Sequence, residues 1–376
     1  MKLLLFILTT LTALIGCSRA QIENSIGVSY SVTNRFSATG LAPLPGQFVV
    51  DKDERNKIIV RFNREVKNKW GDNASQSSKT RYVKYLNQYN DRIEVDFERE
   101  TIKVSTVAKR GKEQRLQSLL VTTFLTPDKP DQVDLYSDKA ITLNAPPFLL
   151  GRIHDTDNLP IRYEWRAKRH AMHLVSSQMK SEHINGKPTS YVQIKMTPVR
   201  STNNPHYEKY GRLVQKAAND YNIPEYLIWT IMKIESSFNP FAVSWAGAYG
   251  LMQVVPSTAG VDVFKLVKKK SGKPTPKYLY NPANNIDTGS AYFHILQTRY
   301  LKDIKNPQSK MYAMVSAYNG GAGGVFRTFS KSNKEAIRII NSMTSDQVYS
   351  RLANNHPNSE ARGYVRKFRQ YRGDFM

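Results

Sequence analysis

The spacing of hydrophobic residues changes about halfway along the chain. Short β-prone runs recur in the first half, at 82–85, 92–97, 101–104 and 191–196. Helical spacing occupies residues 107–126 and 164–180 between them. This mixture predicts an α+β N-terminal domain over residues 47–200.

The second half of the chain has a helical pattern. Pro198 to Pro205, where Ser, Thr, Asn and Pro accumulate, separates the two halves. Strand patterns are largely absent beyond this break, and further helices are expected near 285–300, 308–318, 333–342 and 345–354, with another after 358. We therefore expect a second, helical domain over residues 201–376.

One expected helix, Pro224 to Glu235, is apolar on nearly all sides and so reads as a core helix. Ile228, Ile231, Met232 and Glu235 follow the spacing of a single helical face. A carboxyl group buried on that face has a raised pKa and can hold a proton near neutral pH, as a general acid must. From this helix alone, a glutamate at the helix end that reaches solvent is an equal alternative.

The N-terminus has the pattern of a signal peptide. Met1 and Lys2 precede an apolar stretch from Leu3 to Ile15 that is too short to span a bilayer. Residues 1–16 are therefore expected to be removed. Residues 17–46, rich in Ser, Thr, Asn, Gly and Pro, are expected to form a tether.

The single cysteine of the chain stands at the end of this signal. The run Leu14 to Cys17 resembles the bacterial lipobox, whose cysteine becomes lipid-modified and N-terminal after cleavage. This resemblance implies a palmitate-bearing lipoprotein, and Ser18 in place of an aspartate implies the periplasmic face of the outer membrane. An ordinary signal peptide with a stray buried thiol is the alternative.

Composition limits the remaining classes. The chain has 376 residues and a formal net charge of +24, which favours an anionic partner. Nucleic acid is not expected, because the dense basic run Lys268 to Lys270 reads as a solvated loop and no nucleic-acid motif accompanies it. His154, His170, His173 and His183 fit no zinc spacing and are interpreted as surface residues. We expect neither a metal nor a cofactor.

Two further segments carry polar residues suited to a sugar-binding cleft. Gly250-Leu-Met-Gln253 brings a side-chain amide that can donate and accept hydrogen bonds, after a glycine that permits close backbone approach. Tyr318 and Asn319 stand just before Gly320-Gly321, the expected C-terminal cap of a helix.

Four motifs in order resemble the lytic transglycosylase family. They are Glu235-Ser236-Ser237, Gly250-Leu-Met-Gln253, Ala317-Tyr-Asn319 and Ser359-Glu-Ala-Arg-Gly-Tyr364, where Ala361 replaces the threonine of many members. The segments 133–151 and 285–292 extend the resemblance to a membrane-bound member of the family. It implies an all-α, lysozyme-like catalytic domain of the goose-type or SLT class.

The resemblance also implies an activity, that of a lyase cleaving the MurNAc-β-1,4-GlcNAc bond of peptidoglycan without water to give 1,6-anhydromuramyl products in cell-wall remodelling and turnover. Glu235 would act first as acid and then as base. The residues implied to bind substrate are Ser244, Met252, Gln253, Tyr318, Asn319, Glu360 and Tyr364. Ser236 and Ser237 are expected to cap or turn the helix end instead. The implied partners are glycan strands and the outer membrane, and the N-terminal domain is a candidate surface for cell-wall proteins.

Glycosidases ordinarily use two carboxyl groups about 5–10 Å apart. The next acids after Glu235 are Asp262 and Asp287, and Asp287 is more simply interpreted as a residue that caps a helix or satisfies its dipole. The lack of an evident second catalytic carboxyl group in the sequence favours a lyase over a hydrolase. A hydrolytic muramidase and a non-catalytic peptidoglycan-binding lipoprotein stay open as alternatives.

Overall fold

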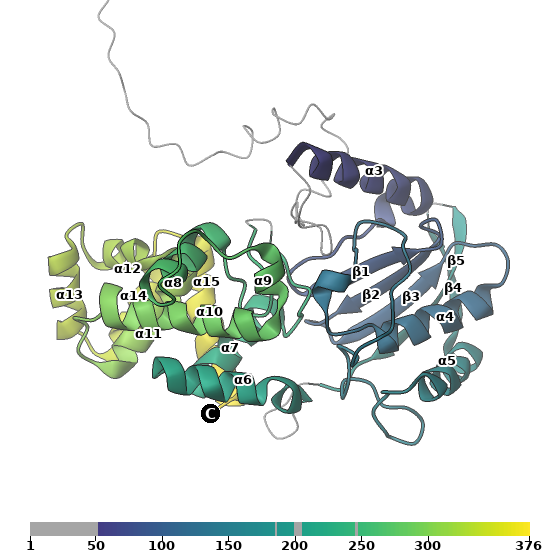
Figure 1. The fold of residues 1–376 in the computed structure, drawn as a ribbon. Coiled ribbons are helices and arrows are strands. Elements are labelled where there is room, and N and C mark those ends of the chain that lie inside the picture. Colours follow the sequence, from purple (N-terminus) through teal and green to yellow (C-terminus); the bar gives the residue numbers. More distant parts are fainter. Residues whose placement is uncertain (1–51, 185, 199–204, 245–246) are drawn as a thin grey trace, which may run out of the picture. The chain divides into compact units, whose positions relative to one another are not determined.

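A computed structural model describes residues 52–184, 186–198, 205–244 and 247–376 (Figure 1). The expected signal peptide, Cys17 and the tether over 17–46 lie outside the described residues. None of the helices in the described ranges combines the length and the apolar character needed to cross a bilayer.

A five-stranded antiparallel sheet forms the centre of the first half, with strand order β1-β2-β3-β5-β4. The strands are β1 (Arg81–Leu86), β2 (Asp91–Asp96), β3 (Thr101–Thr106), β4 (Lys180–Ile184) and β5 (Lys187–Lys195). Each predicted β-prone run is confirmed as a strand. The sequence pattern missed β4 because it is a largely exposed edge strand and only its last residue, Ile184, is buried.

Three helices accompany this sheet: α3 (Lys52–Trp70), α4 (Lys112–Leu125) and α5 (Glu164–Gln178). The helices α4 and α5 pack on each other and against the sheet, as Figure 1 shows. Both were predicted, whereas α3 was missed. Its buried apolar residues form only a narrow stripe in a strongly charged helix, namely Ile59, Phe62, Val66 and Trp70.

The second half is helical, as predicted, and its described residues contain isolated β-bridges but no strand. Its helices are α6 (Pro205–Tyr221), α7 (Glu225–Ser236), α8 (Val261–Leu266), α9 (Pro276–Tyr280), α10 (Pro282–Ile295), α11 (Pro307–Gly320), α12 (Ala322–Phe329), α13 (Asn333–Ser342), α14 (Ser345–Asn355) and α15 (Ser359–Tyr371). The short helices α8, α9 and α12 were not predicted, because five to eight residues are too few to show a helical period.

Helix α7 is a core helix, with nine of its 12 residues buried. It packs against α6 and α15, while α11 packs against α14 and α15. Its C-cap, Ser237, has a left-handed backbone (φ 50°), so the chain turns sharply after the last helical residue. This turn brings the end of α7 against the segment near Leu251, to which Ser236 is hydrogen-bonded.

Local sequence fixes where the neighbouring helices begin. Asn281 and Asn306 each accept a hydrogen bond through the side chain from a backbone N–H three residues later, and each is followed by proline at the first helical position. Asn358 caps α15 through Glu360 N at 2.7 Å. These caps set the starts of α10, α11 and α15, from which most of the candidate site is built.

Candidate active site

Glu235 occupies the last turn of α7 and is only 6% exposed. The pKa of its carboxyl group is raised to about 7, and burial is the largest influence on this pKa. The positive charge of Lys79, a hydrogen-bonding interaction with the Tyr364 hydroxyl and the charge of Lys367 lower this pKa, while Glu360 raises it. Glu235 can therefore be protonated or ionised near neutral pH.

Two tyrosines border this carboxyl group. Burial, and next the charge of Glu235, raise the pKa of both Tyr318 and Tyr364 well above the ordinary tyrosine value, so both are neutral donors. The Tyr364 hydroxyl is buried without a hydrogen bond of standard geometry to any described residue. It is thus available to donate to Glu235 or to a substrate oxygen.

The loop after α7 places the amide of Gln253 by an unusual backbone path. Gln253 has φ 49° and Gly250 has φ 71°, both left-handed. The Gln253 side chain donates from Nε2 to the Gly250 carbonyl at 3.0 Å. Its Oε1 is buried, and no partner for it exists in the described ranges. The amide therefore keeps one acceptor for a ligand.

Asn285 of α10 organises this loop and was not singled out as a site residue from the sequence. Its Oδ1 accepts from Met252 N at 2.8 Å, and its Nδ2 donates to the carbonyls of Tyr249 (2.7 Å) and Leu279 (2.8 Å). A Cβ on Gly250 would lie 2.5 Å from Asn285 Nδ2, so the loop needs glycine there. Asn285 could have been found from the sequence, because an asparagine on the apolar side of an expected helix indicates a buried side chain that needs hydrogen-bond partners.

Met252 joins this loop to α10 and α11. Its carbonyl accepts from the Tyr318 hydroxyl at 2.8 Å, and the Tyr318 ring stacks on Phe293 with centroids 4.4 Å apart. The side chain of Met252 is fully buried and lies against Gly289, where a Cβ would approach its Sδ to 2.6 Å. The structure thus links Met252, Gln253 and Tyr318 to one another.

Ser236, Ser237 and Ser244 form hydrogen bonds with backbone groups near the site. Ser236 Oγ lies 3.0 Å from the Met232 carbonyl and 2.8 Å from the Leu251 carbonyl, and it donates to these oxygens. Ser237 is the C-cap of α7. Ser244 accepts through Oγ from Ala248 N at 3.1 Å, which closes its own turn. All three hydroxyls therefore have structural partners in the absence of substrate.

Asn319 and Glu360 occupy different surroundings. Asn319 follows Tyr318 near the end of α11, and its buried Oδ1 has no hydrogen-bond partner within the described part of the chain. Glu360 lies in the first turn of α15, and its side chain is 65% exposed. Its carboxylate lies 4.0 Å from Lys79 Nζ. Asn319 thus offers a free acceptor, and Glu360 a solvated charge.

The two acids that follow Glu235 along the chain have other roles. Asp262 accepts from the exposed Tyr300 hydroxyl at 3.0 Å. Asp287 accepts from the Tyr221 hydroxyl at 2.6 Å and pairs with Lys268. The expectation that Asp287 serves the start of a helix is wrong, because α10 begins at Pro282 under the Asn281 cap.

The basic run is only partly the solvated loop that was expected. Lys269 and Lys270 are exposed, but the side chain of Lys268 is only 18% exposed and pairs with Asp287. This ion pair joins the segment after α8 to α10. The pattern of charges along the sequence cannot show such a contact.

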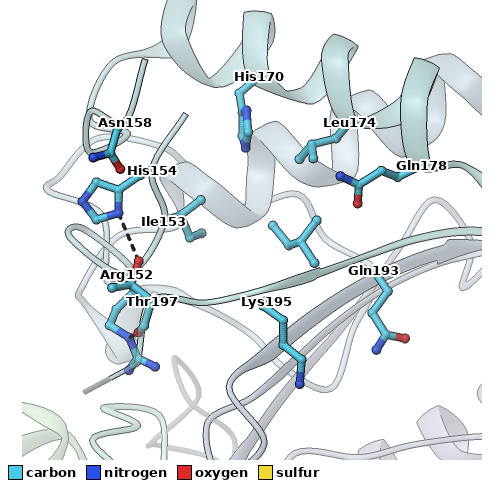
Figure 2. A pocket seen from close by; sticks show the side chains of 11 residues that line it. Arg152, Ile153, His154, Asn158, His170, Leu174, Gln178, Gln193, Lys195 and Thr197 are labelled. Carbon is cyan, nitrogen blue, oxygen red and sulfur yellow. Dashed lines mark hydrogen bonds between the residues drawn. The ribbon is translucent and has the colours of Figure 1, made fainter. Parts of the chain in front are cut away.

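The histidine interpretation is also partly wrong. His173 and His183 are exposed, but His170 is 8% exposed, since it faces inward from α5 (Figure 2). His170 and His154 line a cavity of about 460 Å³ between α5 and β5, where the His154 ring hydrogen-bonds to the Thr197 hydroxyl at 3.1 Å. In the described ranges, no group of three His, Cys, Asp or Glu side chains is placed to hold a metal ion.

This cavity differs chemically from the surroundings of Glu235. No carboxyl group is among its lining residues, all of which the structure describes, and Ile153, Leu174 and Ile194 are its aliphatic members. It therefore has no counterpart of the buried carboxyl group of Glu235, which is the centre of the candidate active site.

Comparison with known proteins agrees with the sequence motifs. Residues 48–206 match the family described as membrane-bound lytic murein transglycosylase C, N-terminal domain, and residues 212–341 match the transglycosylase SLT domain. The membrane-bound lytic murein transglycosylase C of Photorhabdus laumondii is 42% identical over 323 residues, covering 85% of this chain and 90% of that protein. The chain belongs to this family.

A second relative gives the same picture. The protein of the same name from Yersinia pestis is 39% identical over 371 residues, covering 98% of this chain and 97% of its own. Among solved structures, the 70 kDa soluble lytic transglycosylase of Escherichia coli is 27% identical, covers 43% of this chain and 23% of that chain, and has a TM-score of 0.32.

Membership confirms the fold class predicted from the motifs, an α+β domain followed by a helical SLT domain. It also confirms the enzyme class, since lytic murein transglycosylases are lyases. The predicted upstream resemblance, over 133–151, falls within the matched N-terminal domain. Membrane association is implied by the relatives' name.

Proposed function

We propose that the enzyme cleaves the MurNAc-β-1,4-GlcNAc bond of peptidoglycan without water and releases 1,6-anhydromuramyl products. The observation that carries the proposal is the buried carboxyl group of Glu235, whose pKa near 7 suits both donation and acceptance of a proton. Family membership supports the reaction class. Its physiological role would be cell-wall remodelling and turnover.

The proposed reaction uses one carboxyl group twice. Glu235 first gives its proton to the glycosidic oxygen, the C1–O bond breaks, and the GlcNAc end leaves as an alcohol. The muramyl acetamido group stabilises the cation at C1. The Glu235 carboxylate then takes the proton of the muramyl 6-hydroxyl while O6 bonds to C1, which regenerates the acid and consumes no water.

The residues around Glu235 supply groups to orient such a substrate. The free Oε1 of Gln253 and the free Oδ1 of Asn319 are buried acceptors suited to sugar N–H and O–H groups, and neither has a partner in the described ranges. The neutral hydroxyl of Tyr364 is a donor beside the reacting carboxyl group. Tyr318, whose hydroxyl holds the Met252 carbonyl, is proposed to border the cleft together with Met252, Ser244 and Glu360.

A hydrolytic muramidase is the second candidate, and one observation favours it. Glu360 is a second carboxylate close enough to raise the pKa of Glu235, and in a muramidase it would activate water. Its high exposure and its pairing with Lys79 fit a solvated charge better than a catalytic base. The products separate the two reactions.

The experiment compares Glu235→Gln with Glu225→Gln, a matched change at the exposed first turn of the same helix. Digestion of purified sacculi is followed by mass spectrometry of the soluble muropeptides. We expect loss of at least about 100-fold in rate for Glu235→Gln and a near-normal rate for Glu225→Gln. Anhydro ends support the lyase, reducing ends the muramidase, and an inactive wild type the non-catalytic binding lipoprotein.

The chain's location and organisation complete the proposal. We propose removal of residues 1–16, lipid attachment at Cys17, and a tether to residue 46 that holds the enzyme at the periplasmic face of the outer membrane. An N-terminal domain over 47–200 and a catalytic domain over 201–376 would follow. Radiolabelled palmitate incorporated by the wild type but not by Cys17→Ala tests the anchor.

A further inference from the structure

The segment just before β1 reaches the candidate active site from the other half of the chain. The Asn239 side chain, four residues after Glu235, donates from Nδ2 to the carbonyl of Lys79 at 3.2 Å and lies 3.4 Å from that of Ser78. Asn239 is fully buried, and its Oδ1 accepts from Phe241 N at 3.0 Å. This amide therefore fixes the backbone of Lys79 relative to the end of α7.

The same segment is rigid on its own side. Ser77 Oγ accepts from Val83 N at 2.9 Å, and Ser78 N donates to the Arg81 carbonyl at 2.8 Å. Tyr82 is fully buried and packs on Phe241 with ring centroids 4.9 Å apart. The position of Lys79 is thus set by packing and by backbone hydrogen bonds, with its own side chain free to serve another purpose.

The Lys79 ammonium lies near the first turn of α15. Its Nζ is 4.0 Å from Glu360 Oε1, on the first turn of α15. Helix α15 also carries Tyr364, whose hydroxyl interacts with Glu235. Lys79 therefore brings a positive charge beside Glu360, and this charge also acts on Glu235.

We propose that Lys79 is a positioning residue of the active site, whose ammonium offsets Glu360, so that Glu235 gives up its proton in the first half of the reaction and stays ionised to act as the base in the second. The proposal rests on the proposed role of Glu235. A buried carboxyl group beside an unbalanced carboxylate would hold its proton too firmly to become a base. The half that precedes the SLT domain thus contributes directly to the ionisation of the catalytic acid.

The electrostatic surroundings of Glu235 agree with this role. The charged and titratable groups that face it come from three other parts of the fold, namely Lys79 before β1, Tyr318 on α11, and Glu360, Tyr364 and Lys367 on α15. Of the charges, Lys79 has the largest influence, and it lowers the pKa of Glu235, in opposition to burial. Its side chain is 42% exposed, so solvent screens part of this interaction.

The test is the pH dependence of the initial rate of sacculus digestion by the full-length chain, at substrate levels where the rate reports kcat/KM. Lys79→Arg should keep the midpoint of the alkaline limb. Lys79→Met should move it to higher pH, Lys79→Glu further in the same direction, and Glu360→Gln to lower pH. Lys109→Met removes an exposed lysine of the same half and should leave the profile unchanged.

Each outcome has a defined meaning. An alkaline limb that stays in place in Lys79→Met and Lys79→Glu, with thermal transitions like that of the wild type, overturns the proposal. A variant with a lowered thermal transition is read at a temperature where it is folded, because the midpoint in pH is independent of the amount of active enzyme. If Glu235→Gln keeps the wild-type rate, the role of Glu235 has failed instead, which separates the two failures.

Discussion

The hydroxyl of Tyr318 donates a hydrogen bond to the carbonyl of Met252 at 2.8 Å. This bond joins the last turns of α11 to the loop that presents Gln253, and the stacking of Tyr318 on Phe293 fixes the direction of the hydroxyl. Burial raises the pKa of Tyr318 well above the ordinary tyrosine value, so the hydroxyl keeps the proton that it donates in this bond.

Tyr318→Phe should loosen this loop while keeping the ring in place. The lost hydrogen bond leaves the buried carbonyl of Met252 without its donor, which costs about 1–3 kcal/mol of stability, and a displaced Gln253 should lower the lytic rate roughly tenfold. Thermal unfolding and sacculus digestion measure the two effects. Tyr300→Phe, which removes an exposed hydrogen bond to Asp262, is the matched control. Equal effects of both variants would contradict the special role of Tyr318.

Asn285→Ala should be more damaging than any single change on the surface of α10. It removes three hydrogen bonds, to Met252, Tyr249 and Leu279, and leaves these buried backbone groups unsatisfied. We expect a loss of about 3 kcal/mol, observed as a lowered thermal transition. Asn284→Ala, one position earlier and partly exposed, should stay within about 0.5 kcal/mol of the wild type. A tolerated Asn285→Ala would show that the loop holds its shape without this residue.

The longer helices of the second half could be predicted from the sequence because their apolar residues recur at helical spacing, whereas the short helices α8, α9 and α12 were missed. The position of Glu235 on a buried face could be predicted for the same reason. In contrast, α3 hides a narrow apolar stripe among charges, and β4 is an exposed edge strand. Neither presents the amphipathic pattern on which sequence analysis depends.

The contacts that shape the site were less accessible to sequence analysis. Lys79 lies more than 150 positions before Glu235, and only the folded chain shows that Asn239 fixes its backbone beside α7. Asp287 and Lys268 likewise meet only because α8 and α10 pack together. From the sequence alone such charged residues are interpreted as solvated, because ion-pair partners that are distant in the sequence leave no local pattern.

The raised pKa of Glu235 also predicts how stability depends on pH. The unfolded chain ionises this group from about pH 4.5, while the folded chain keeps it protonated up to about pH 7. Folded protein therefore binds more protons than unfolded protein in this window, so stability is intact below pH 4.5 and falls as the pH rises to 7. The loss is on the order of 3 kcal/mol.

Glu235→Gln should remove this contribution. The variant should unfold at a higher temperature than the wild type at pH 8, and the two should converge near pH 4.5, as calorimetry can measure. Glu225→Gln, exposed on the same helix, should show no such difference. If the stabilities of the wild type and of Glu235→Gln change with pH in parallel, Glu235 ionises at an ordinary pKa.

Gly289→Ala tests whether the close packing of α10 on Met252 controls the active-site loop. A Cβ at position 289 would lie 2.6 Å from the Sδ and 2.9 Å from the Cβ of Met252, so a movement of the flexible thioether alone cannot relieve the overlap. The loop must shift, which should cost about 1–3 kcal/mol and lower the lytic rate. Gly363→Ala on α15, where nothing lies within 4 Å of the added Cβ, should instead be neutral or slightly stabilising. When Gly289→Ala is combined with Met252→Ala, the total loss should be smaller than the sum of the two single losses, because the overlap with Sδ and Cε is gone. A strictly additive double variant would show that the two residues do not press on each other.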